Sequence, residues 1–126
     1  MDITPLIAKD KKSITGHDRA GFYVNGDYVS GSIIILPDQV QAIAIQTLKD
    51  LTLKLLQPVI DSKVEILLLG CGEVHLQLES DLTLSLAGVG ITAEVMTTHA
   101  ACRTYNILLA EGRNVAALLI KGNVNV

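Results

Sequence analysis

Two short polar segments contain most of the side chains in this sequence that could do chemistry. One runs from Gly70 to Glu73, and the other runs from Met96 to Arg103. Each follows an apolar run typical of a β-strand, and the second leads directly into a helical pattern. Ligands of an open parallel sheet bind beyond the carboxyl ends of its strands, so the two segments are expected to face one site.

The chemistry expected at that site is anion binding. Backbone N–H groups at the start of a helix, together with the helix dipole, favour a negative charge, and the Arg103 guanidinium would add to them. The candidate ligand-binding residues are Gly70, Cys71, Gly72, Thr97, Thr98, Cys102, Arg103 and Asn106. In a purely structural interpretation the glycines turn the chain, Thr98 caps the helix and Arg103 donates to loop carbonyls. The sequence alone leaves both interpretations open.

Four side chains of the types that bind zinc lie in or near these segments. Cys71 and His75 have the spacing C-x3-H, and His99 and Cys102 have the spacing H-x2-C. Thiolate and imidazole ligands of this kind can form a tetrahedral zinc site. Two such short pairs also arise easily by chance, so we predict neither a bound metal nor another cofactor.

Cys102 is the residue that most suggests covalent catalysis. A thiol near a helix N-terminus and beside Arg103 can have a lowered pKa and act as a nucleophile. Cys102 also follows two alanines, which is more typical of a small core residue, and His99 three positions earlier forms no evident dyad with it. We therefore predict no catalytic residue.

His17 has no visible partner in the sequence and is expected at the surface.

Glycine motifs that bind nucleotide phosphates are poorly matched. A dinucleotide fingerprint starting at Gly70 would need a glycine where His75 stands. The glycines at 88 and 90 lead into a strand rather than out of one. The sequence also has no Gly-Lys-Ser/Thr phosphate loop.

The elements that must position these segments are clearest in the second half. Apolar patterns predict strands over 64–69, 91–96 and 115–120, and helices over 79–87 and 98–111. Thr98 is the predicted N-cap of the last helix, and Gly112 lies just past its end. A βαβαβ order at this spacing predicts right-handed crossovers and a largely parallel sheet.

The first half is less regular. Asn25-Gly26 accepts the positive φ angles of a tight turn and predicts a β-hairpin, with a second arm that reaches residue 36. Residues 38–56 fit a helix or a strand almost equally well. A helix over 50–60 is better supported, with Asp50 as its N-cap and Pro58 weakening its last turn.

Length and composition indicate one small domain. The sequence has 126 residues, of which 49% are hydrophobic and only 3% aromatic. Charged residues make up 18%, below the roughly 25% of an average domain, so apolar surface is available for a protein partner or for self-association. A net charge of −3 without a basic cluster argues against nucleic-acid binding.

Targeting features are absent from the sequence pattern. No apolar run approaches the roughly 20 residues of a membrane-spanning helix. The first twelve residues resemble neither a signal peptide nor a transit peptide. We therefore expect a cytoplasmic location and reduced thiols at Cys71 and Cys102.

Residues 96–118 carry a pattern that resembles a known family. They read Met-Thr-Thr-His-Ala-Ala-Cys-Arg-Thr-Tyr-Asn-Ile-Leu-Leu-Ala-Glu-Gly-Arg-Asn-Val-Ala-Ala-Leu. The blocks Ala-Cys-Arg-Thr-Tyr-Asn, Glu-Gly-Arg and Val-Ala-Ala are similar to those of the domain-of-unknown-function family that includes the mitochondrial respiratory complex I assembly factor 3. Residues 66–72, which end in Gly-Cys-Gly, resemble the Gly-x-Gly segment of that family. The resemblance extends from about residue 13 to residue 120.

That resemblance implies a single α/β domain with three layers. Its parts are an N-terminal tail over 1–12, an antiparallel β layer over 13–45 and an α/β unit over 50–120, with a mixed, largely parallel sheet flanked by helices. It also implies that 40–45 is a strand. The sequence departs from the family pattern at Thr97, where an Asp is common, and this puts a general-base role at that position in doubt.

The resemblance implies no established reaction, because the mitochondrial members of the family act through protein partners. We therefore predict a non-catalytic, partner-binding or assembly-factor-like domain. The alternative is a protein that binds a small molecule or anion, either as a binding protein or as an enzyme, with the segments 70–73 and 96–103. The first prediction is preferred because no acid–base pair is visible.

Overall fold

Alternating apolar residues build a central sheet that is buried on both faces. The computed structural model describes residues 7–73 and 80–122. In strand β4 (Ser32–Leu36), Ile33 and Ile35 point to one face, while Ile34 and Leu36 point to the other. All four side chains are fully buried, as expected for a strand covered on both sides.

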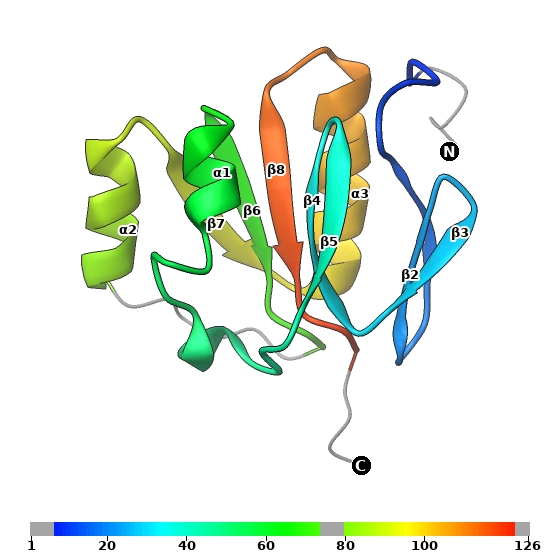
Figure 1. Cartoon of the computed structure of the whole chain (residues 1–126), viewed down its shortest axis with the longest axis horizontal. Coiled ribbons are helices and arrows are strands. Elements are labelled where there is room, and N and C mark those ends of the chain that lie inside the picture. Colours follow the sequence, from blue (N-terminus) through cyan, green and yellow to red (C-terminus); the bar gives the residue numbers. More distant parts are fainter. Residues whose placement is uncertain (1–6, 74–79, 123–126) are drawn as a thin grey trace.

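The central sheet has five strands in the order β5-β4-β8-β6-β7 (Figure 1). Besides β4, they are β5 (Gln39–Ile43), β6 (Ile66–Gly70), β7 (Thr92–Met96) and β8 (Val115–Leu119). β6 lies between β7 and β8 and is parallel to both, whereas β4 is antiparallel to β5 and β8. The mixed, largely parallel sheet and its βαβαβ second half are as predicted.

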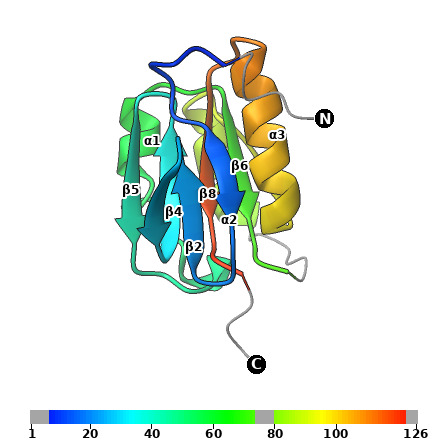
Figure 2. The same ribbon diagram turned by 90° about the vertical axis from the view of Figure 1, so that its right-hand side faces the viewer.

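A second, antiparallel sheet of three strands packs on one face of the first. Its strands are β1 (Ile14–His17), β2 (Gly21–Val24) and β3 (Asp27–Ser30), in that order across the sheet. The predicted turn at Asn25-Gly26 joins β2 to β3, with φ angles of 51° and 87°. Figure 2 shows this small sheet beside helix α3 (Thr98–Ala110), so the two share one layer.

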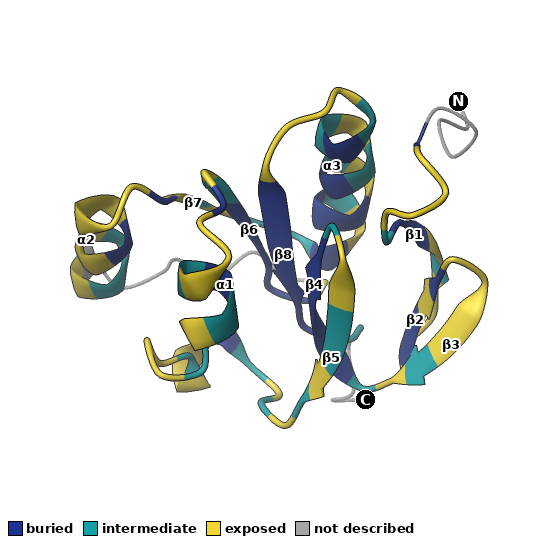
Figure 3. Ribbon diagram, turned by 45° about the horizontal axis from the view of Figure 1, so that its top comes forward, coloured by how far each residue is buried: buried dark blue, intermediate teal, exposed yellow. Residues whose placement is uncertain are grey.

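The other face of the central sheet is covered by three short helical segments. They are η2 (Leu48–Asp50), α1 (Gln57–Asp61) and α2 (Ser80–Gly88). Two apolar cores therefore exist, one on each side of the sheet, which confirms the predicted three-layer α/β fold. In Figure 3 the buried residues are concentrated on β4, β6 and β8 and on the inner face of α3.

The structure corrects three details of the first half. The arm predicted to run from the hairpin to residue 36 is interrupted at Gly31, whose φ is 89°, and the chain there leaves the small sheet for the central one. The β layer over 13–45 is thus divided between two sheets. The helix expected over 50–60 is replaced by η2 and α1, and Pro58 lies in the first turn of α1 rather than weakening its end.

Candidate functional site

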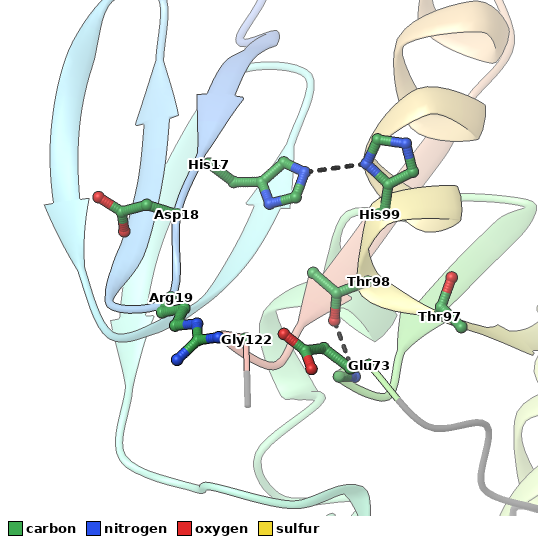
Figure 4. Close-up of a pocket in the computed structure, with 9 residues that line it drawn as sticks. His17, Asp18, Arg19, Glu73, Thr97, Thr98, His99 and Gly122 are labelled. Atoms are coloured by element: carbon green, nitrogen blue, oxygen red, sulfur yellow. Dashed lines mark hydrogen bonds between the residues drawn. The ribbon is translucent and has the colours of Figure 1, made fainter. Parts of the chain in front are cut away.

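A polar pocket of about 370 Å³ opens where the three parallel strands end. Gly70, Met96 and Leu119 are paired across β6, β7 and β8 at this edge, which is where an open α/β sheet binds ligands. Four segments line it: the β1–β2 turn, the loop after β6, the start of α3 and the chain after β8 (Figure 4). The lining residues are His17, Asp18, Arg19, Gly72, Glu73, Thr97, Thr98, His99 and Gly122.

Thr98 joins three of these segments from a buried position. Its Oγ1 accepts a hydrogen bond from the Gly72 N–H at 2.8 Å and donates one to the Ile120 carbonyl at 2.7 Å. The Thr98 N–H donates to the Gly72 carbonyl at 2.9 Å. One side chain thus fixes the floor of the pocket.

Position 70 has little room for a side chain in this arrangement. A Cβ at Gly70 would lie 3.0 Å from the Thr98 Cα and 3.1 Å from the Thr98 Oγ1. A larger residue would therefore push the start of α3 away from the end of β6. This tight approach explains the glycine that the sequence places at the end of the apolar run.

The N-cap of α3 is Thr97 rather than Thr98, which corrects the sequence prediction. Thr97 has extended φ and ψ angles of −61° and 155°, and its Oγ1 accepts from the Ala100 N–H at 3.4 Å. Both threonines could serve as caps chemically, but the Thr98 hydroxyl is used by Gly72 and Ile120. Thr97 therefore accepts a hydrogen bond from a backbone N–H in the first turn of α3, and it also lines the pocket.

Asp18 shapes the β1–β2 turn on the opposite wall. Its Oδ1 accepts hydrogen bonds from the N–H groups of Ala20 and Gly21 and from the Tyr28 hydroxyl, at 2.8, 2.9 and 2.9 Å. The hydrogen bonds from Ala20 and then Tyr28 lower the pKa of the Asp18 carboxyl. These bonds hold its carboxylate at the turn, and Figure 4 shows this carboxylate pointing away from His99 and Glu73.

Two histidines meet at the rim of the pocket. The Nε2 of His17, at the end of β1, lies 3.2 Å from the Nδ1 of His99, in the first turn of α3. Burial and the neighbouring His99 lower the pKa of His17, while Asp18 partly offsets them. No partner for His17 was predicted from the sequence, and no local signal indicates one, because the two residues are 82 positions apart.

The predicted candidate residues fall into separate environments. Gly72, Thr97 and Thr98 line the pocket, and Gly70 lies beneath Thr98. Arg103 is exposed on α3 and does not line the pocket. Asn106 is used in the fold, since its side chain accepts from the Ile14 N–H at 2.9 Å and donates to the Ile14 carbonyl at 2.7 Å. It therefore holds β1 against α3.

The two cysteines belong to opposite cores. Cys71 packs in the core beneath α1 and α2, and Cys102 packs in the core beneath α3 and the small sheet. Burial raises the pKa of the Cys102 thiol to about 12, which opposes a thiolate nucleophile at neutral pH. The sequence could not separate the two faces, because it does not show on which side of the sheet each cysteine packs.

The four side chains that the sequence offers as zinc ligands do not come together around the two cysteines. Cys71 and Cys102 lie on different sides of the central sheet, and His75 lies outside the described residues. Within residues 7–73 and 80–122, no three side chains of His, Cys, Asp or Glu gather as a metal site would require. Over the same ranges, no helix combines the length and apolar character needed to cross a membrane.

Fold and site together define a class of protein, a three-layer α/β domain whose polar pocket opens at the carboxyl ends of three parallel strands. A family model described as a protein of unknown function, DUF498/DUF598, matches residues 14–120. The chain belongs to this family, as the resemblance in its second half indicated.

Several curated relatives of the chain are respiratory-complex assembly factors that carry the same name. NADH dehydrogenase (ubiquinone) 1 alpha subcomplex assembly factor 3 of Xenopus tropicalis is 31% identical over 109 residues, which cover 85% of this chain and 60% of the relative. The Homo sapiens protein of the same name is 33% identical over 113 residues, covering 85% of this chain and 59% of the relative. The chain thus spans about 60% of the length of these relatives.

Solved structures share the fold over almost the whole chain. A protein from Bartonella henselae, described as an outer membrane protein, has a TM-score of 0.82 and 34% identity, covering 90% of this chain and 97% of its own. A Bordetella pertussis protein described as an Mth938-like domain has a TM-score of 0.79 and 27% identity, covering 93% and 91%.

Proposed function

We propose that the chain is a partner-binding domain that acts as an assembly factor for a respiratory NADH dehydrogenase. The observation that carries this proposal is the similarity to curated assembly factors over 85% of the chain. The family model matches residues 14–120, which include the three-stranded sheet and all the residues that line the pocket except Gly122. A cytoplasmic location and self-association remain predictions from the sequence.

The outer face of the three-stranded sheet is the surface best suited to a protein partner. Tyr23 and Tyr28 stand opposite each other on β2 and β3, with ring centroids 4.9 Å apart. They are 41% and 43% exposed, although the neighbouring Phe22 is fully buried on the inner face. Tyrosine is enriched at protein interfaces because its ring buries a large area while its hydroxyl keeps a polar partner.

Support for small-molecule or anion binding at the two predicted segments is weaker. Arg103, which was to supply the positive charge, lies outside the pocket. The pocket is lined instead by Arg19 together with two acidic residues, Asp18 and Glu73. An anion would therefore enter a lining whose formal charge is −1 when both histidines are neutral, and this disfavours it.

A capture experiment with matched variants tests the proposal. The tagged chain is crosslinked in cells of its own source, and the captured proteins are quantified for wild type, Tyr23→Ala and Leu84→Ala. Leu84 is 68% exposed on α2, far from the tyrosine pair in the fold, and serves as the control. We expect NADH dehydrogenase subunits to be enriched with wild type and Leu84→Ala, and to be reduced at least about tenfold with Tyr23→Ala. Capture without any subunit of that enzyme would contradict the proposal.

A further inference from the structure

We propose that His17 and His99 together bind a divalent transition-metal ion, with zinc as the best fit. The two rings come from β1 and α3 and turn one nitrogen each toward the other at the rim of the pocket (Figure 4). This inference concerns the pocket and does not depend on the proposed assembly role. The two histidines are 82 positions apart, and no sequence pattern links them.

The separation of the two nitrogens matches a tetrahedral zinc site. Zinc binds imidazole nitrogen at about 2.0–2.1 Å, so two such nitrogens at a tetrahedral angle lie about 3.3–3.4 Å apart. The distance between His17 Nε2 and His99 Nδ1 is 3.2 Å. Adjacent positions of a square plane at similar bond lengths would bring them to about 2.9 Å, and opposite positions to about 4 Å. The tetrahedral arrangement therefore requires the smallest movement of the rings.

The protonation chemistry of the pair also suits a metal. Each neutral imidazole has one nitrogen with a lone pair and one N–H, and either nitrogen can carry the proton. In the metal-free pair, one ring donates to the other. Binding of zinc requires only that both rings adopt the tautomer that leaves the facing nitrogen unprotonated.

The site is open to solvent, and its lining has more acidic than basic side chains, which opposes the unfavourable effect of the α3 N-terminus on a cation. Both histidines are exposed, so an ion can reach them from solvent. Asp18 and Glu73 outweigh Arg19 in the pocket lining and leave a formal charge of −1. The two cysteines, which bind zinc more strongly as thiolates, are buried at 7% and 4% exposure and stand in the two apolar cores.

The protein supplies two ligands, and water or oxygen donors in the pocket complete the coordination. This follows from the finding that, within the described residues, no third side chain of a metal-binding type lies close enough to form a cluster. Such an open site has a modest affinity, but it links two segments 82 residues apart in the sequence. A metal that binds only the folded chain stabilises it in proportion to the logarithm of its concentration.

Titration of the whole chain with zinc chloride tests the proposal. The imidazole signals of all histidines are followed by NMR in wild type, His17→Gln, His99→Gln and Arg103→Ala. Glutamine can preserve a hydrogen bond to the remaining ring but lacks an imidazole nitrogen. Arg103 is the control, because it is exposed on the same helix outside the pocket.

We expect the His17 and His99 signals of wild type to shift together with one midpoint, at one zinc ion per chain. The affinity is expected to fall at least about tenfold in each glutamine variant and to stay unchanged in Arg103→Ala. Because the joint shift is measured on wild type, the test does not depend on folding of the variants. A shift of one ring alone, or no saturation at millimolar zinc, would overturn the proposal and leave a hydrogen-bonded pair only.

Discussion

Replacing Thr98 by valine tests the structural account of the pocket floor. Valine has nearly the same shape as threonine but cannot donate or accept a hydrogen bond. The substitution therefore removes the bonds to the Gly72 N–H and the Ile120 carbonyl without opening a cavity. Both backbone groups lie in buried residues, and Thr98 itself is only 4% exposed.

The expected loss of stability follows from those two groups. A buried donor or acceptor left without its partner costs about 1–3 kcal/mol, so losing the partner of both groups is expected to lower the free energy of unfolding by about 2–6 kcal/mol. That is a large part of the roughly 5–15 kcal/mol that stabilises a typical domain. At about 4 °C per kcal/mol for a chain of this size, Tm is expected to fall by about 8–24 °C.

Urea and thermal unfolding followed by circular dichroism measure this change. Thr98→Ser is the matched control, because serine keeps the hydroxyl and removes only a methyl group. We expect it to retain most of the stability, within about 1 kcal/mol of wild type. The reasoning is refuted if Thr98→Val unfolds within about 0.5 kcal/mol of wild type.

Three further predictions concern neighbouring features. Asn106→Ala removes both bonds to Ile14 and should lower stability by about 1–3 kcal/mol, with faster hydrogen exchange of the Ile14 amide in NMR; unchanged exchange would argue against this link between β1 and α3. Gly70→Ala should cost about 1–3 kcal/mol in a denaturation experiment, because its Cβ would meet the Thr98 backbone at 3.0 Å, and a neutral effect would contradict the tight approach. Cys102 should resist alkylation by iodoacetamide at pH 8 in the folded chain, since a pKa of about 12 leaves roughly one thiolate in 10⁴, and rapid labelling would oppose its burial. Folding raises this pKa, so burial of the neutral Cys102 thiol contributes fully to the free energy of unfolding below the ordinary thiol pKa. This contribution is lost as the pH rises toward 12.

The second half of the fold was predictable from the sequence because each of its elements has a strong local pattern. β6 and β8 are continuous apolar runs, and α3 begins with a capping threonine and ends before Gly112, which has a φ of 76°. The family resemblance then supplied the strand at β5, which periodicity alone left undecided. Local signals and the global fold agree in these segments.

The segment before β6 shows where local signals fail. Leu51 and Leu55 have helical spacing, yet residues 51–56 are not helical, and both side chains pack partly buried against the core below the sheet. The leucines at this spacing lie instead in a loop that crosses this face of the central sheet. Packing against the sheet therefore overrides the helical pattern, and the α-helix forms only after Leu56.

The structure has a pocket at the ends of the parallel strands, where the sequence predicted a candidate site, but the residues that line this pocket were only partly predictable. Thr97 and Thr98 are equivalent as caps in the sequence, and only the contacts with Gly72 and Ile120 assign their roles. The wall formed by the β1–β2 turn depends on how the small sheet packs against α3. Contacts between segments that are far apart in the chain leave no pattern in a single sequence, so His17 was missed.

The most direct test of the assembly role is the level of fully assembled NADH dehydrogenase in cells of the protein's source after its gene is deleted. Native gels with an in-gel activity stain measure that level, and the deletion is complemented with wild type, Tyr23→Ala or Leu84→Ala. The account predicts that deletion lowers the assembled enzyme, and that wild type and Leu84→Ala restore it whereas Tyr23→Ala does not. An unchanged level of assembled enzyme in the deletion strain would contradict the account.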